Sequence, residues 1–155
     1  MAFSVAISRA VHNFLDSDNW KYDPITEGGT IRTGVALDNK LKGADVYIMI
    51  LSNGFVVNSM LSIEAGEQEL FEVLKFISLI NDDNPYGSFG VDLSDGTVIC
   101  RTELFCGSTV PTREQIEFTL YNNIDMLDSY GDALAKVLFG VMTAEDAYEE
   151  AEAAQ

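Results

Sequence analysis

Residues that often carry chemistry are scarce in this sequence. Its 155 residues include one histidine, His12, and two cysteines, Cys100 and Cys106. One histidine and two cysteines that share a strand do not supply the four ligands of a tetrahedral zinc site. The cysteines are six positions apart, which is about 20 Å along an extended strand. Because a disulfide joins α-carbons within about 7 Å, we expect both thiols to be free, as in a reducing cytoplasm.

Basic residues are also few. Lys and Arg number 9 against 25 Asp and Glu, so the formal net charge is −16. A surface of that sign repels phosphate backbones and anionic lipid headgroups, so we expect neither nucleic acid nor a membrane surface as a partner. Most of this charge is typical of a solvated surface, although it also favours a basic partner protein.

Long apolar runs are absent as well. No run approaches the roughly 18 residues of a membrane-spanning helix. The first residues, Ala2–Ser8, lack a basic leader and are followed by Arg9, which is unlike a secretory signal peptide. We therefore expect a cytoplasmic protein.

No motif for catalysis, phosphate binding or metal binding stands out. The acidic ends of Asp16–Glu27 mimic a calcium loop, but Lys21 occupies the position where an EF-hand needs glycine. Gly28–Gly29 opens no helix and is followed by no lysine, unlike a phosphate-binding loop. His12 lies on the polar side of a predicted helix with no nucleophile nearby. We expect no catalytic, cofactor or metal residues, and a protein that is not an enzyme.

The longest regular pattern is a predicted helix over Pro111–Val141. Thr112 and Gln115 form a capping box at its start, and Gly140 suits its C-terminal end. Gly131 interrupts the pattern and leaves open whether the helix is continuous, bent or split. One apolar stripe runs along the segment at helical spacing: Ile116, Leu120, Ile124, Leu127, Leu134, Leu138 and Val141.

Alternating segments before this helix predict antiparallel strands. Thr30–Asp38 and Ala44–Ser52 alternate, and Asn53–Gly54 predicts a two-residue type I′ turn that would pair Ile50 with Val57. A second hairpin turns at Asp95–Gly96. Its predicted register pairs Leu93 with Val98 and Val91 with Cys100, and its predicted core face is Phe89, Val91, Leu93, Val98, Cys100 and Leu104.

Three further helices complete the prediction. They are Phe3–Leu15, the strongly apolar Glu67–Ile80, which we expect to be deeply buried or packed against two neighbours, and a short acidic helix over 143–155 capped by Thr143. The fold class is therefore α+β, with an antiparallel sheet of about five to six strands packed against the long C-terminal helix. At this length we expect a single domain over 1–155, which would bury roughly 70% of its unfolded surface.

The face of the first hairpin opposite the predicted core is too apolar for a fully solvated surface. Either a second layer of the chain or another molecule must cover it. We take it as the candidate partner-binding surface, made by Tyr47, Met49, Leu51, Val56 and Met60.

Several segments resemble the YbjN family. They are Asp128–Leu134, Val137–Gly140 and Thr143–Ala147, with Asn19–Tyr22, Ala44–Ile50 and Asp95–Thr97 upstream, in matching order over nearly all of the chain. The resemblance implies a bacterial regulator of sensory transduction. It also implies a type III secretion chaperone-like fold, found in small acidic proteins that are usually dimers and bind other proteins. The family supplies no catalytic residues.

Together these observations favour a non-enzymatic, cytoplasmic regulatory or chaperone-like protein that binds another polypeptide as a homodimer. The polypeptide partner is not identified by the sequence. The alternative is a small-ligand sensor with a pocket between helix and sheet near Trp20 and Tyr22.

Overall fold

A computed structural model describes residues 2–155 of the chain. The elements follow the order α1 (Val5–Ser17), β1 (Thr30–Ala36), β2 (Gly43–Ile50), β3 (Gly54–Glu64), α2 (Leu70–Asp82), β4 (Gly87–Asp92), β5 (Thr97–Phe105), α3 (Arg113–Leu138) and α4 (Ala144–Ala153). The strands form one five-stranded sheet in the order β1-β2-β3-β5-β4. Every neighbouring pair is antiparallel. The predicted α+β fold and order of elements are confirmed.

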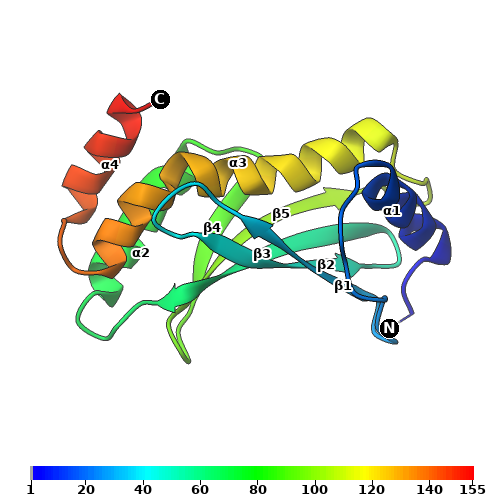
Figure 1. Ribbon diagram of the computed structural model, residues 1–155, viewed down its shortest axis with the longest axis horizontal. Coiled ribbons are helices and arrows are strands. Elements are labelled where there is room, and N and C mark those ends of the chain that lie inside the picture. The colour runs from blue at the N-terminus through cyan, green and yellow to red at the C-terminus, as the bar shows by residue number, and fades with distance from the viewer. Residues whose placement is uncertain (1) are drawn as a thin grey trace.

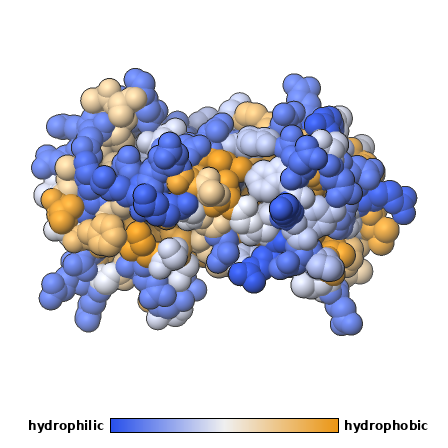
Figure 2. All heavy atoms as spheres, in the orientation of Figure 1, coloured by the Kyte–Doolittle hydropathy of each residue, from blue (hydrophilic) through white to orange (hydrophobic). Residues whose placement is uncertain are grey.

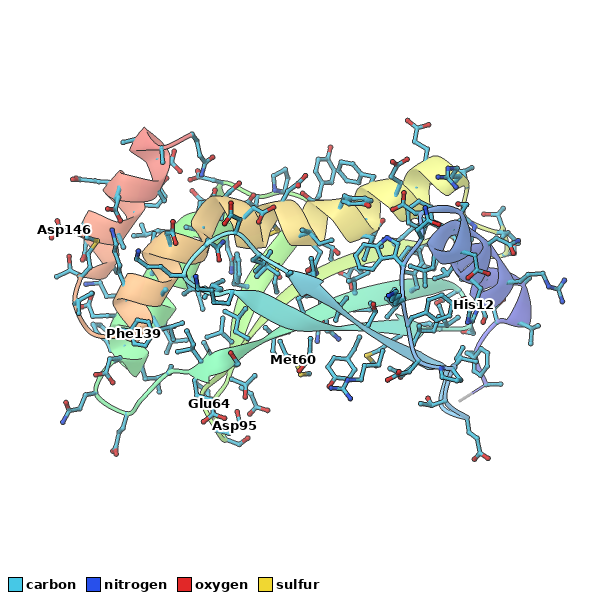
Figure 3. The ribbon with its side chains drawn as sticks, viewed as in Figure 1. His12, Met60, Glu64, Asp95, Phe139 and Asp146 are labelled. Carbon is cyan, nitrogen blue, oxygen red and sulfur yellow. The ribbon has the colours of Figure 1, made fainter. Side chains whose placement is uncertain are left out.

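The helices lie on one face of the sheet, which we call the inner face (Figure 1). α3 crosses this face, α1 packs near one end of α3, and α2 and α4 lie near the other. The inner face is apolar because alternate strand residues turn toward the helices, among them Ile31, Val46, Ile48, Phe55, Val57 and Val98, all buried. Met60 points the opposite way, to the outer face (Figure 3).

α3 is a single helix of 26 residues and begins with the predicted capping box between Thr112 and Gln115. Its stripe from Ile116 to Leu138 is buried, and Gly140 follows its end with a φ of 71°. Gly131 does not split it. A Cβ at Gly131 would lie 2.3 Å from the Asn39 side chain, so glycine there allows the β1–β2 loop to approach the helix.

One buried polar side chain of α3 is hydrogen-bonded to the neighbouring strands β3 and β5. Asn123 is fully buried, and its Nδ2 donates to the carbonyl oxygens of Val57 on β3 and Cys100 on β5, each at 3.1 Å. Its Oδ1 accepts a hydrogen bond from the hydroxyl of Ser59. Thr102 donates to the α3 carbonyl of Thr119 at 2.7 Å. These directional bonds fix where the helix sits along the sheet, which apolar contacts alone specify poorly.

The first hairpin has its predicted faces but not its predicted register. Ile50 pairs with Phe55 and Ile48 with Val57, a shift of two residues from the predicted pairing. The connection is still two residues long, but it lies over Ser52 and Asn53 instead of Asn53 and Gly54, with the Leu51 amide donating to the Gly54 carbonyl at 2.9 Å. Gly54 serves a different purpose, because a Cβ there would lie 2.1 Å from the Leu104 carbonyl oxygen. Since side chains alternate with period two, the same residues still reach the core.

The second hairpin differs in the same way. Val91 pairs with Val98 and Phe89 with Cys100, again two residues from the prediction. The turn spans more residues, with the Gly96 amide donating to the Asp92 carbonyl at 2.7 Å and Gly96 at a φ of 82°. Leu93 therefore lies in the turn and is 70% exposed, so its placement in the core was wrong. Cys100 and Cys106 are both free, as predicted.

The remaining helices are capped largely as the sequence indicates. Thr143 accepts from the Asp146 amide at the start of α4, and Ala144, Ala147 and Ala151 bury its inner side against α2 and α3. α2 packs against α3, α4 and β4, yet its Phe71 side chain is 70% exposed. Of the two alternatives predicted for α2, deep burial on all sides is wrong and packing against neighbouring elements is confirmed.

Replacing Asn123 tests the link between α3 and the sheet. Asn123→Ala leaves two carbonyl oxygens and the Ser59 hydroxyl without this partner, so we expect the free energy of unfolding to fall by about 3 kcal/mol. Urea unfolding followed by circular dichroism measures it. The adjacent Asn122→Ala is the matched control, and equal stability of the two variants would contradict the assignment.

Candidate functional site: the uncovered face of the sheet

The outer face carries neighbouring apolar side chains from three adjacent strands. Met49 on β2 pairs with Val56 on β3, and Met60 on β3 pairs with Ile99 on β5. Tyr47 lies between them on β2 and faces Asn58. We call Tyr47, Met49, Val56, Met60 and Ile99 the outer-face patch.

The patch is partly exposed and no helix covers it (Figures 1 and 3). Met49 is 39% exposed, and the other four residues are half-buried by their neighbours in the sheet. Leu51, predicted to belong here, is half-buried in the β2–β3 turn. Ile99 was missed, although it lies two and four residues before Arg101 and Glu103 on β5. This spacing puts the three side chains on one face and is the signal that would have placed Ile99 there.

Charged side chains of both signs surround the patch. Arg32 lies 3.5 Å from the Asp45 carboxylate and its guanidinium lies 6.0 Å from the centre of the Tyr47 ring. Arg101 donates to the Asn58 side chain at 2.8 Å. The Asn58 amide in turn lies 3.3 Å from the Met49 sulfur. Asn58 is only 5% exposed, so these hydrogen bonds let a polar residue lie beneath the centre of the face.

Other segments of the chain occupy part of each sheet edge. On β1, Tyr22 bridges Thr33, and the Asp23 amide donates to the Arg32 carbonyl at 2.8 Å. On β4, the Asn81 side chain accepts from the Phe89 amide at 2.8 Å and donates to the Phe89 carbonyl at 3.0 Å. Backbone groups that would otherwise recruit another strand are occupied at these two positions.

The aromatic residues Trp20 and Tyr22, near which a sensor pocket was predicted, have different surroundings. Trp20 packs edge-on against Tyr121 with ring centres 6.2 Å apart. Tyr22 lines a shallow hollow of about 360 Å³ at the β1 edge, together with Lys21, Asp23, Arg32, Thr33, Gly34 and Asp45. A small-ligand sensor that used Tyr22 would bind its ligand in this surface hollow.

Reactive and metal-binding groups are dispersed over residues 2–155. No three His, Cys, Asp or Glu side chains in this range lie close enough to hold a metal ion. Burial raises the pKa of the Cys100 thiol to about 12, so this thiol stays protonated at neutral pH. Within the same residues, none of the helices has both the length and the apolar character to cross a membrane.

Most of the surface seen from the side of Figure 2 is hydrophilic, with hydrophobic side chains in separate patches. This distribution agrees with the strongly acidic composition.

The sequence and the fold are both similar to those of known proteins. The sequence model of the YbjN family, described as "Putative bacterial sensory transduction regulator", matches residues 9–136. The chain belongs to the YbjN family. The match covers every strand of the YbjN-type sheet and α3 almost to its end. A search of curated proteins gives no match.

A solved structure has a similar fold. The chain is similar to the crystal structure of YbjN, a putative transcription regulator from E. coli, with 14% sequence identity and a TM-score of 0.63. The similarity covers 82% of this chain and 90% of that chain. At this identity the likeness shows the YbjN fold alone.

The pH dependence of stability tests the contacts of α1 with α3. Asp18 accepts hydrogen bonds from Tyr121 and from Trp20, and these bonds, the one from Tyr121 foremost, lower the pKa of its carboxyl. A lowered pKa in the folded state gives stability above the unfolded pKa of about 3.9 that is lost as pH falls through the folded pKa. We expect Asp18→Asn to lose stability at neutral pH and to show a weaker decline in acid.

Thermal unfolding between pH 3 and pH 7 measures this effect. Asp23→Asn, which removes the same charge nearby, is the control for charge alone. If Asp18→Asn and Asp23→Asn change stability equally at every pH, the hydrogen bonds of Asp18 contribute nothing to stability.

Proposed function

We propose that this YbjN-family protein is a non-enzymatic, cytoplasmic regulator or chaperone-like protein that acts by binding another polypeptide and forms a homodimer through the outer-face patch. We further propose that residues 1–155 act as one unit. The observation that carries the proposal is the outer face itself, since the helices lie on the opposite side and apolar side chains of three strands remain partly exposed.

Covering this patch with a second copy would be favourable for a hydrophobic reason. Apolar surface removed from water contributes about 25 cal/mol per Å². Met49 projects from β2 and its thioether adapts to an irregular opposing surface. Tyr47 adds a ring that combines apolar area with a polar tip, which is typical of interface cores.

The charges on the outer face are compatible with a second copy as the partner. The whole chain carries −16, so two copies repel each other at most orientations. On the outer face, however, Arg32 and Arg101 balance Asp45 and Glu103. In an isologous interface each contact between two different residues occurs twice, so a two-fold axis that sets Arg101 opposite Asp45 of the other copy forms that ion pair twice.

A substitution within the patch tests the dimer. We expect the native protein to have a dimer mass by light scattering at micromolar concentration, and Met49→Asp to be a monomer, because burying an unpaired carboxylate opposes association. Phe71→Asp, an equally apolar-to-acidic change at an exposed position of α2 on another surface, is the control and should stay dimeric. A native monomer would contradict the proposed dimer.

Salt should strengthen the dimer. Each chain carries −16, and raising the salt concentration shortens the Debye length to about 8 Å near 0.15 M, which screens repulsion between the two copies. We expect the dimer dissociation constant to fall at least severalfold between low and physiological salt in sedimentation equilibrium. Weaker association at higher salt would mean that attractive ion pairs, and not apolar contact, hold the copies together.

A further inference from the structure

Within residues 2–155, the end of β5 is a stretch of strand that has a neighbouring strand on one side only. β4 begins at Gly87, which pairs with Thr102 of β5. β5 continues to Phe105, and its last residues pair with β3 on one side only, as in the pairing of Phe105 with Gly54. The side of β5 beyond Thr102 that β4 would occupy therefore has no strand beside it.

The backbone groups of Phe105 and Glu103 point toward this open side. In an antiparallel sheet, successive residues direct their N–H and C=O groups to opposite neighbours. Phe89 uses its groups on Asn81 at the outer edge of β4, so Ser88 and Gly90 bond to β5 at Arg101 and Ile99. Two and four residues beyond Arg101, Glu103 and Phe105 have the same orientation. The Cys106 amide agrees with this alternation, since it bonds to Asn53 on the β3 side.

Local sequence explains why β4 begins at Gly87 and does not extend along the last residues of β5. Pro85 fixes its φ outside the range of an ideal strand, so the chain before Gly87 does not continue β4. Asn84 is held by the Ile80 carbonyl at 2.6 Å and by the Tyr130 hydroxyl at 3.2 Å. Tyr86 turns toward α3, where its ring meets Phe118 edge-on with centres 5.4 Å apart. The loop thus leaves β5 before the strand ends.

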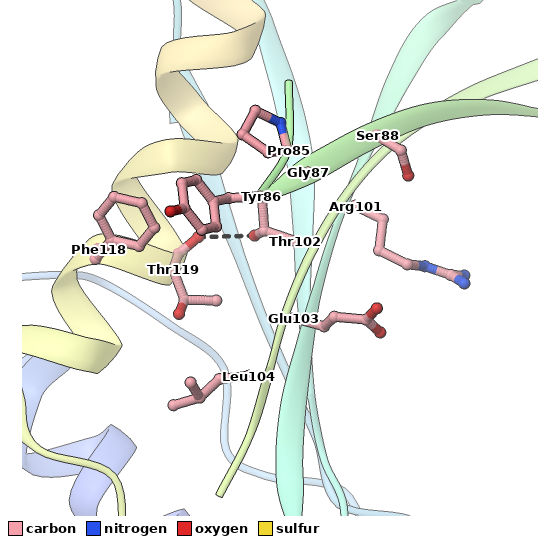
Figure 4. A pocket seen from close by; sticks show the side chains of 10 residues that line it. All are labelled: Pro85, Tyr86, Gly87, Ser88, Arg101, Thr102, Glu103, Leu104, Phe118 and Thr119. Atoms are coloured by element: carbon pink, nitrogen blue, oxygen red, sulfur yellow. Dashed lines mark hydrogen bonds between the residues drawn. The ribbon is translucent and has the colours of Figure 1, made fainter. Parts of the chain in front are cut away.

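A hollow of about 530 Å³ adjoins this open edge (Figure 4). Tyr86, Phe118 and Leu104 contribute apolar walls on the inner side of β5. Arg101 and Glu103 extend to the other side of the strand. Tyr86 is 68% and Phe118 is 52% exposed, so two aromatic rings stand in water beside the end of β5.

The charge near the hollow indicates the chemistry of its occupant. Glu103 lines the hollow, and Glu114 is exposed one helical turn before Phe118, on the same side of α3. Arg101 already donates to Asn58 on the outer face. Because the whole chain also carries −16, a basic segment would be attracted and an acidic one repelled.

We propose that the open end of β5 and the hollow beside it bind an extended basic segment of another polypeptide, which adds as a short strand next to Glu103–Phe105. Side chains of an added strand alternate between faces. An apolar residue of the segment enters the hollow beside Leu104 and Phe118, and its basic neighbours lie on the outer face near Glu103. Backbone hydrogen bonds supply affinity and the alternation supplies selectivity. This site is separate from the outer-face patch and does not depend on the proposed dimer.

Two variants at one position isolate the backbone contribution. Phe105→Pro removes the outward N–H without removing a bond to β3, because that N–H faces the open side, and proline is tolerated at such edges. Phe105→Val removes the ring and keeps the N–H. The probe is a fluorescein-labelled peptide of eight residues that alternates leucine with lysine, and fluorescence anisotropy measures its affinity. We expect Phe105→Pro to weaken binding at least tenfold and Phe105→Val less than threefold.

A second measurement leaves the protein intact. The same peptide with N-methyl groups on alternate backbone nitrogens keeps its charge and side chains but loses the donors on one edge. When the methylated nitrogens are those that face β5, we expect this peptide to bind at least tenfold more weakly than the parent peptide. We expect the Phe118→Ala protein to bind the parent peptide severalfold more weakly than the native protein does. Met49→Asp should bind the parent peptide unchanged, which separates this site from the dimer surface.

Three results would overturn the proposal. They are the absence of saturable binding of the parent peptide, equal affinity of the Phe105→Pro and Phe105→Val variants with both folded by circular dichroism, and equal affinity of the parent and N-methylated peptides. The last two would mean that the acidic surface attracts the peptide by charge alone.

Discussion

The hydrogen bonds of Asn123 set the arrangement on which the rest of the structure depends. A fully buried amide in the middle of α3 is bonded to a carbonyl of each central strand. Leaving such a group unpaired costs more than the bonds contribute, so the helix has one favourable position along the sheet. Apolar packing along the inner face provides most of the driving force. The amide decides where along that face the helix rests.

With α3 fixed there, the helices share the inner face and the outer face has no helix over it. The chain places a buried asparagine, Asn58, beneath Met49 and Arg101 on that side. It also occupies one edge with Tyr22 and the other with Asn81. The surfaces that remain are the outer-face patch and the end of β5, and they offer different contacts. The first presents apolar side chains, and the second presents backbone groups next to aromatic rings.

Sequence patterns predicted the elements well and the hairpin registers poorly. Both turns were expected to be of two residues centred on Asn53–Gly54 and Asp95–Gly96. The first instead lies one residue earlier, over Ser52 and Asn53, and the second spans four residues, because the glycines have other functions. Gly54 permits close approach to the Leu104 carbonyl, a contact between residues distant in sequence. The shift is two residues in both hairpins, so the predicted faces were kept for Met49, Val56 and Met60. Leu93 was misplaced because it became part of the turn, and Leu51 for the same reason left the strand.

The sequence by itself determined the caps of α3 and α4, the alternation of the strands and the family, since these depend on residues within a few positions of one another or on their order. Only the tertiary structure decided that β5 lies between β3 and β4, that Ile99 joins the outer-face patch, and that the end of β5 has a neighbouring strand on one side only. Those features rest on contacts such as Asn123 with Val57, 66 residues apart. No local pattern encodes such a contact, because its energy exists only once the helix and the sheet have packed together.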